Sequence, residues 1–249
     1  TYDWSTGSTS EDISELGVGI YSVTATDENG CSVSISVEIT ETDEMSISET
    51  HSDYTGYGVS CNGSTDGWID VTVTGGTGNY TYDWSTGSIS EDIFELGVGT
   101  YSVTVTDENG CSVSIDSIDI TEPTEIIISE EHSDYTGYGV SCSGSTDGWI
   151  DVTVSGGDGV YTYNWSNGTN TEDLFDLASD SYLLTVTDER DCTATILVEI
   201  TETDEMSISE THSDYTGYGV SCNGSTDGWI DITVTGGTGN YTYDWSTGS

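Results

Sequence analysis

The sequence predicts an all-β protein: tandem immunoglobulin-like antiparallel β-sandwich domains of about 80 residues, arranged as a rod or filament. Three observations predict this class. A Tyr-x-Trp-Ser block recurs at Trp4, Trp84, Trp165 and Trp245, in steps of 80, 81 and 80 residues. Within each repeat, short segments alternate apolar and polar residues between Gly-rich turns, and no apolar pattern of helical period continues past one turn. A repeat of this length can hold its own core, unlike a solenoid unit.

Short acidic segments without Gly mark the joints between repeats, at residues 40–44, 121–125 and 201–205. The second joint contains Pro123, the only proline of the chain, which stiffens an extended segment. We therefore expect a C-terminal half of a repeat at 1–41, complete immunoglobulin-like domains at 42–122 and 123–202, and an N-terminal half at 203–249. Residues 40–88 and 201–249 are identical except at Val71 and Ile232, and we expect the chain to be part of a longer array.

The strands of one repeat can be placed in chain order. The repeat at 42–122 contains an alternating strand at 68–73, a Gly-rich turn at 75–78, an aromatic strand at 80–85, a strand at 101–106, an Asn-Gly turn at 107–110 and a last strand from residue 111 onward. Asn-Gly between alternating segments is the strongest short hairpin signal. With the remaining apolar segments, the pattern gives about seven short strands per repeat, as in an immunoglobulin-type sandwich.

The alternation also assigns the large aromatic residues to faces of their strands. Trp84 and Trp165 are predicted between the two sheets, whereas Trp68 and Trp149 lie on the opposite face of their strand from the apolar residues. Tyr101 follows a Leu-Gly-Val-Gly segment and is expected to form a tyrosine corner.

One repeat has an extra residue in its last strand. Ile120 lies nine residues after Cys111, whereas its counterpart Ile200 lies eight residues after Cys192. The extra residue falls within 114–118. We predict a β-bulge there, because a shift of register would turn the later apolar side chains outward.

The six cysteines are Cys31, Cys61, Cys111, Cys142, Cys192 and Cys222. Two cysteines per domain indicate one disulfide in an oxidising compartment. The spacing within a domain is 50 residues, which predicts the pairs Cys61–Cys111 and Cys142–Cys192 and leaves Cys31 and Cys222 to partners outside this sequence. The alternative is a Cys111–Cys142 bond across the joint.

The chain is a polyanion, with a net charge of −45 from 46 acidic residues and a single base, Arg190. Such a surface repels nucleic acids and anionic membranes, and no apolar run is long enough to cross a bilayer. The acidic side chains keep an exposed polymer soluble, and cations are the charged partners that fit them. Calcium is the cofactor to consider; no dedicated calcium loop is present, and the candidate ligands are Glu41, Asp43, Glu44, Asp66, Asp70 and Asp107.

The three histidines occupy one position in three repeats, at His51, His132 and His212. We expect no enzymatic activity and no catalytic residue, because no triad, metalloprotease or phosphate-loop motif is present. His51 opens a loop that contains Tyr54 and Tyr57. This loop has three interpretations: it covers its own sandwich, it packs on a neighbouring domain or chain, or it forms a platform for a sugar.

Three segments resemble a known repeat. Residues 61–76 (Cys-Asn-Gly-Ser-Thr-Asp-Gly-Trp and the strand that follows), residues 80–87 (Tyr-Thr-Tyr-Asp-Trp-Ser-Thr-Gly) and residues 96–111, which end in Asp-Glu-Asn-Gly-Cys, are similar in order and spacing to the SprB-type repeat of Bacteroidetes. That repeat occurs in giant cell-surface adhesins, including those of gliding bacteria. The resemblance implies secretion, an outer-surface location, and adhesion or filament formation.

An exposed bacterial filament can also be glycosylated. Acceptor sequons occur at Asn62, Asn79, Asn164, Asn167, Asn223 and Asn240, and the segment around Ser117 resembles the O-glycosylation acceptor of Bacteroidetes.

The resulting functional expectation is a surface fibre or adhesin stalk that gives adhesion and reach at the bacterial cell surface, with gliding as one setting. Two alternatives remain open: a structural filament assembled from laterally or head-to-tail packed repeats, and an array of carbohydrate-binding modules. The expected partners are other copies of the repeat or neighbouring chains, and a surface or glycan ligand, with neither nucleic acid nor an inserted membrane segment.

Overall fold

The computed structural model describes residues 1–247, which form strands β1 to β17 and no helix. The contacts of the chain divide it into two compact units, Thr1–Gly58 with Thr65–Thr121, and Val59–Ser64 with Glu122–Ser249. Each unit is described by itself below. Among the described residues, no helix has the length and apolar character needed to cross a membrane. The boundaries of the repeats given above remain predictions.

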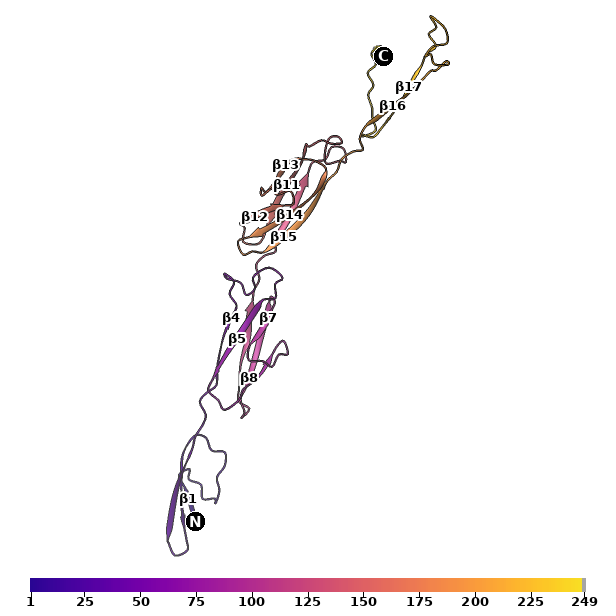
Figure 1. The fold of residues 1–249 in the computed structure, drawn as a ribbon. Helices are drawn as coiled ribbons and strands as arrows, with labels where there is room; N and C mark the ends of the chain where they lie inside the picture. The colour runs from indigo at the N-terminus through magenta and orange to yellow at the C-terminus, as the bar shows by residue number, and fades with distance from the viewer. Residues whose placement is uncertain (248–249) are drawn as a thin grey trace. The chain divides into compact units, whose positions relative to one another are not determined.

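The first unit contains a sandwich of two three-stranded antiparallel sheets, labelled in part in Figure 1. One sheet has the order β4 (Ser46–His51), β5 (Gly67–Thr74) and β7 (Ile93–Leu96). The other has the order β6 (Thr81–Trp84), β8 (Gly99–Thr106) and β9 (Ser112–Ile120). The fold class is therefore all-β, as predicted, but the repeat has six strands rather than about seven. The backbone N–H groups of Trp84 and Gly87 donate to the carbonyls of Ser88 and Trp84 and close a turn directly after β6. The chain between β6 and β7 therefore begins with a turn and not with a further strand.

The core of this sandwich follows from the alternation in its strands. Ile69 and Val71 on β5 are 0% and 2% exposed, and Val103 and Val105 on β8 are 1% and 0% exposed. Trp84 is buried, as predicted, and its indole nitrogen donates to the Ser90 carbonyl at 2.9 Å, so the buried N–H keeps a partner.

The opposite face of β5 is less covered. Trp68 and its counterpart Trp149 are only half-buried, as the alternation predicts. Tyr101 forms the expected corner, because its hydroxyl donates to the Gly97 carbonyl at 3.0 Å.

The predicted bulge in the last strand is confirmed. Tyr101 lies opposite Ile118 and Val103 lies opposite Ile115, so an advance of two residues along β8 corresponds to three residues along β9. The extra residue thus lies between Ile115 and Ile118, within the predicted segment. Ile118 and Ile120 stay 2% and 1% exposed, which shows that the bulge absorbs the insertion and keeps the later side chains in the core.

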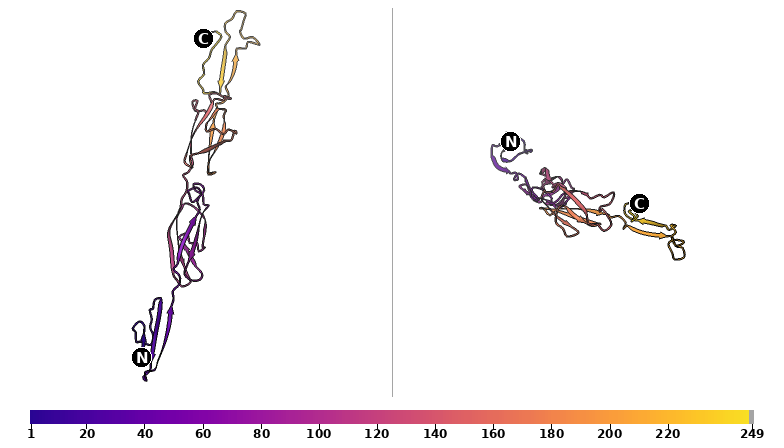
Figure 2. Two further views of the ribbon diagram at one scale, coloured as in Figure 1. Left: turned by 90° about the vertical axis from the view of Figure 1, so that its left-hand side faces the viewer. Right: turned by 90° about the horizontal axis from the view of Figure 1, so that it is seen from above.

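The second unit contains an equivalent sandwich, which Figure 2 shows from two further directions. Its sheets have the orders β10 (Ile127–His132), β11 (Gly148–Ser155) and β13 (Leu174–Leu177), and β12 (Tyr161–Trp165), β14 (Asp180–Asp188) and β15 (Thr193–Ile200). Trp165, Leu184 and Val186 lie in one buried cluster and are 2%, 0% and 0% exposed. The pairing of β14 with β15 has no register shift, in keeping with the shorter last strand.

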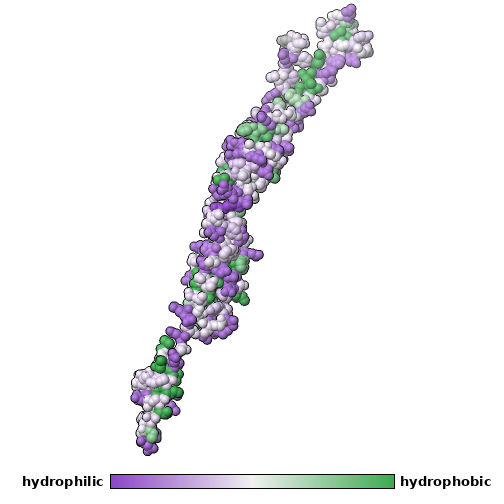
Figure 3. Space-filling view, turned by 60° about the vertical axis from the view of Figure 1, so that its left-hand side comes forward, coloured by the Kyte–Doolittle hydropathy of each residue, from purple (hydrophilic) through white to green (hydrophobic). Residues whose placement is uncertain are grey.

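The two predicted half repeats each form one sheet. Residues 1–41 form β1 (Tyr2–Trp4), β2 (Gly19–Thr26) and β3 (Ser32–Ile39), and residues 203–247 form β16 (Ser207–His212) and β17 (Ile230–Thr235). On β3, Val33 and Ile35 are 71% and 61% exposed, whereas their counterparts on β9 are half-buried. Figure 3 shows hydrophobic atoms on the surface among the hydrophilic ones.

Candidate functional site

The most distinctive chemical feature of the structure is a disulfide between successive repeats. Cys61 is bonded to Cys192, with an S–S distance of 2.06 Å and a Cα–Cα distance of 5.6 Å, across 131 residues of sequence. Cys61 lies in the loop between β4 and β5, and Cys192 lies in the turn between β14 and β15. The four remaining cysteines are free and exposed: Cys31, Cys111, Cys142 and Cys222. The predicted pairs Cys61–Cys111 and Cys142–Cys192 are therefore wrong, and so is the alternative Cys111–Cys142.

The geometry of one sandwich explains this correction. Cys61 precedes β5 at the Gly67 end of that strand. The turn that leads to Cys111 lies at the other end, because Asp107 accepts a hydrogen bond from the Thr77 backbone just after β5. The eight residues of β5 extend over about 27 Å at 3.4 Å per residue. A disulfide requires Cα atoms within about 7 Å, so Cys61 and Cys111 cannot pair within one sandwich.

The spacing of the observed bond also accounts for the free cysteines. Cys142 is the counterpart of Cys61 one repeat later, and Cys111 is the counterpart of Cys192 one repeat earlier. A partner 131 residues after Cys142 or before Cys111 would fall outside residues 1–249. Cys61 and Cys192 are the only cysteines in this sequence with the required separation.

The loop that holds Cys61 also forms hydrogen bonds with the joint at residues 121–125. The Gly63 backbone N–H donates to a Glu122 carboxylate oxygen at 2.7 Å, and the Asn62 side-chain amide donates to the Pro123 carbonyl at 3.1 Å. Pro123 is buried. Beside the disulfide lies a groove of about 390 Å³. The acidic joint residue Glu122 thus acts as an acceptor for backbone N–H, and the next joint repeats this bond between Gly144 and Glu202 at 2.7 Å.

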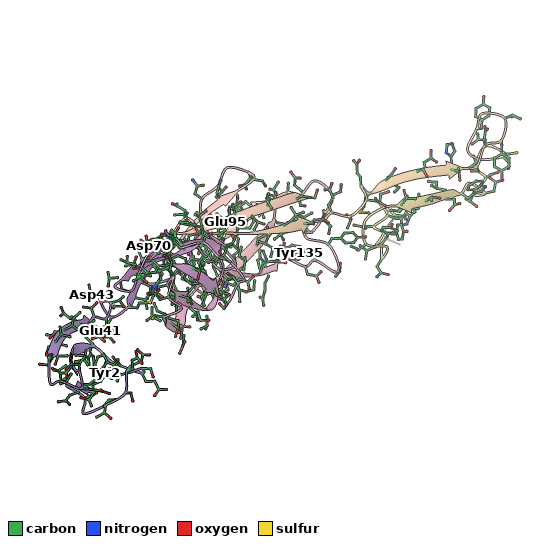
Figure 4. The ribbon with its side chains drawn as sticks, turned by 90° about the horizontal axis from the view of Figure 1, so that it is seen from below. Tyr2, Glu41, Asp43, Asp70, Glu95 and Tyr135 are labelled. Carbon is green, nitrogen blue, oxygen red and sulfur yellow. A yellow bond between two sulfur atoms is a disulfide. The ribbon has the colours of Figure 1, made fainter. Side chains whose placement is uncertain are left out.

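The candidate calcium ligands do not gather in one place. Among residues 1–247, no group of three or more His, Cys, Asp or Glu side chains is placed to hold a metal ion. In Figure 4, Glu41 and Asp43 are labelled on the segment between β3 and β4, and Asp70 on β5. Calcium binding by these residues, or by Glu44 and Asp66, stays a prediction.

Asp107, considered above as a calcium ligand, accepts backbone hydrogen bonds within a hairpin turn. Its carboxylate accepts hydrogen bonds from the Asn109 and Cys111 backbones at 2.9 Å each, and from the Thr77 backbone at 3.0 Å. Burial raises the pKa of the Asp107 carboxyl, but the hydrogen bonds from Cys111 and Thr77 outweigh it, so the pKa lies below its usual value. Asp107 therefore closes the hairpin turn, in which Gly110 adopts a φ of +84°.

The second sandwich lacks both of the hydrogen bonds that Thr77 donates to Asp107, from its backbone N–H and from its hydroxyl. Asp188 is the counterpart of Asp107 and is 5% exposed, yet its Oδ2 has no hydrogen-bond partner. Asp158 occupies the position of Thr77, and its carboxylate accepts instead from the Val160 backbone at 3.1 Å. The hydroxyl that Thr77 donates to Asp107 at 3.2 Å is thus missing here.

The histidine and tyrosine loop folds on its own repeat. His51 bonds to Glu49 at 2.9 Å, and the same pairing recurs for His132 with Glu130 and for His212 with Glu210. The bond to Glu210 raises the pKa of His212 above its usual value.

The tyrosines of this loop make local contacts. The Tyr54 backbone donates to the Tyr57 carbonyl at 2.7 Å, and the Tyr54 hydroxyl donates to the Asp66 carbonyl at 3.2 Å. Its counterpart Tyr135, labelled in Figure 4, bonds to Asp147 at 3.2 Å in the same way. These contacts agree with a loop that covers its own sandwich, whereas packing on a neighbour and sugar binding stay predictions.

All the candidate glycosylation residues are exposed. They are Asn62, Asn79, Asn164, Asn167, Asn223, Asn240 and Ser117. Two of them use their side-chain amides within the fold: Asn62 bonds to Pro123, and Asn79 donates to Glu108 at 2.6 Å. Modification stays a prediction at each position.

Comparison with known proteins gives one family and a set of distant folds. A search of curated protein sequences finds no match. Solved structures with some similarity include an amphioxus IgVJ-C2 molecule (15% identity, 49% of this chain and 88% of that one, TM-score 0.25) and extracellular domains 3–5 of Drosophila OTK (13% identity, 74% and 71%, TM-score 0.30). A third is a 282-residue C-terminal intimin fragment in complex with the intimin-binding domain of the translocated intimin receptor (12% identity, 76% and 59%, TM-score 0.29).

The family model of the SprB repeat matches three segments of the chain, at residues 59–89, 140–170 and 220–249. Each segment begins next to a cysteine of the Cys61 type. In the two complete repeats, it extends through the strand that holds the buried tryptophan. The third segment includes residues 248 and 249, which lie outside the described part of the structure. The chain thus contains three segments that match the SprB repeat.

Proposed function

We propose that this chain is a segment of a repetitive extracellular fibre that acts as an adhesin stalk on the outer surface of a bacterium. The observation on which this rests is the SprB repeat at three positions, joined to a disulfide between successive repeats. Disulfides persist in oxidising environments outside the cytosol. A stalk needs stable units in series, and antiparallel sandwiches with a bonded joint meet that need.

The composition supports the same function. The net charge of −45 keeps an exposed polymer soluble and keeps neighbouring fibres apart. The histidines lie at a repeated position on a strand end and pair with glutamate, which fits a structural repeat better than an enzyme. Adhesion to a surface, with gliding as one setting, belongs to this proposal. Its partners are other copies of the repeat, neighbouring chains and a surface or glycan ligand.

Surface accessibility tests the proposal. Antibodies raised against the purified chain are applied to intact cells of the producing organism and to lysed cells, and a cytosolic protein serves as the control antigen. We expect staining of intact cells and its loss after brief protease treatment, because the fibre is exposed. Staining that requires lysis would contradict the proposal. Binding of the purified chain to a glycan array, with no staining of fibres, would favour the carbohydrate-binding alternative instead.

A further inference from the structure

We propose that the Cys61–Cys192 disulfide directs tensile load past residues 62–191, so that a pull on the two ends of the chain does not extend them. The use of this property in an adhesin stalk rests on the function proposed above. The load path itself depends only on which atoms are covalently bonded, and it can be measured without any adhesion ligand.

The bonded chain has a short covalent path. Tension that enters from the N-terminal side passes along β4 to Cys61, crosses the disulfide to Cys192 and leaves along β15. Strands β5 to β9 and β10 to β14 lie inside the closed loop. With the bond intact, β4 and β15 are the only strands of the two complete sandwiches in series with the load.

Without the bond, the same tension crosses the joint along the backbone of residues 121–125, and each sandwich resists it only through the non-covalent contacts between its strands. The joint is then held by the Gly63–Glu122 and Asn62–Pro123 hydrogen bonds and by the fold of the two sandwiches. Unfolding of both would release residues 62–191, so that the two cysteines are separated by 131 residue steps of extended chain. At about 3.3–3.6 Å per extended residue, that length is roughly 45 nm. The disulfide therefore limits the extension of two repeats at once, which a bond inside a single repeat would not do.

Formation of the bond has a defined chemical balance. The thiols of Cys61 and Cys192 lose two protons and two electrons as the S–S bond forms. The oxidant is a disulfide, of a protein or a small molecule, which takes up both electrons and both protons and is reduced to two thiols. A reducing phosphine reverses the step, so the load path can be switched in the intact chain.

Single-molecule pulling tests the inference. The full chain is held by peptide tags at its two ends and stretched until fully unfolded, with and without the phosphine. We expect the oxidised chain to be shorter at full extension by roughly 45 nm, and the reductant to restore that length. Cys61→Ser and Cys192→Ser should each release the whole length without reductant.

Two matched variants serve as controls. Cys111→Ser and Cys142→Ser remove exposed, free thiols and should leave the length unchanged. Equal lengths with and without reductant would overturn the inference. The inference would also be overturned if Cys61→Ser released only part of the length and Cys111→Ser changed the length as well. That result requires separate bonds within the repeats. Because reduction of the unmodified chain gives the same comparison, the test does not depend on the folding of any variant.

Discussion

The missing hydrogen bond of Asp188 gives a prediction at the scale of single residues. Asp158→Thr restores the hydroxyl donor that Thr77 supplies in the first sandwich, and it removes a like charge. We expect the second sandwich to gain about 1–3 kcal/mol of unfolding free energy. The reciprocal change Thr77→Asp should destabilise the first sandwich. Both are measured by urea unfolding, and a loss of stability in Asp158→Thr would contradict the structural assignment.

The tyrosines beside acidic side chains give a second prediction at this scale. Burial and a 2.9 Å hydrogen bond to Glu172 raise the pKa of Tyr163 to about 12, and burial and the charge of Glu91 raise the pKa of Tyr82 to about 12. Because the folded pKa values exceed the unfolded value near 10, the stabilisation is complete below pH 10 and is lost as the pH rises towards 12.

NMR titration of isotope-labelled tyrosines measures these pKa values directly. Glu172→Gln should lower the pKa of Tyr163 and leave that of Tyr82 unchanged, and Glu91→Gln should do the reverse. Each variant is thus the control for the other. An equal effect of one variant on both tyrosines would count against the local cause.

At the scale of strands, the register of the sandwich predicts which tryptophan stabilises it. Trp84 is 2% exposed and sits opposite Val103, whereas Trp68 is half-buried. We expect Trp84→Ala to cost roughly 3–5 kcal/mol of unfolding free energy and Trp68→Ala to cost less. Chemical unfolding followed by circular dichroism compares the two, and a larger loss in Trp68→Ala would show that the faces are assigned the wrong way round.

The strands could be predicted from sequence because their signal is local. Alternation in 68–73 is enough to place Ile69 in the core, and the count from Cys111 to Ile120 is enough to locate the bulge. The pairing of the cysteines could not be predicted from their spacing in the sequence, because two cysteines per repeat have the same spacing whether they pair within a repeat or between repeats. The signal that distinguishes the two was available: Cys61 comes before β5 and Cys111 after β8, and antiparallel pairing puts these points at opposite ends of the sandwich.

At the scale of the whole molecule, the open sheets of the half repeats predict association between copies. Residues 203–247 have nearly the same sequence as the part of the first sandwich that covers β9, and β3 is the exposed counterpart of β9. We expect light scattering of the purified chain to show head-to-tail oligomers at high concentration. Ile35→Glu, on the open face, should reduce them, whereas Ser34→Glu, on the other face of β3, should not. Identical behaviour of the two variants would rule out pairing through this face.

The pairing of Cys61 with Cys192 is most directly tested by cutting the joint. Trypsin cleaves the natural chain after Arg190 alone, and Glu125→Arg adds a second site between the two repeats at an exposed position. After the free thiols are blocked, the denatured variant is digested and its fragments are weighed without reduction. We predict that 1–125 stays bonded to 191–249 while 126–190 is released. A bonded pair of 126–190 with 191–249, and a free 1–125, would contradict the disulfide between repeats.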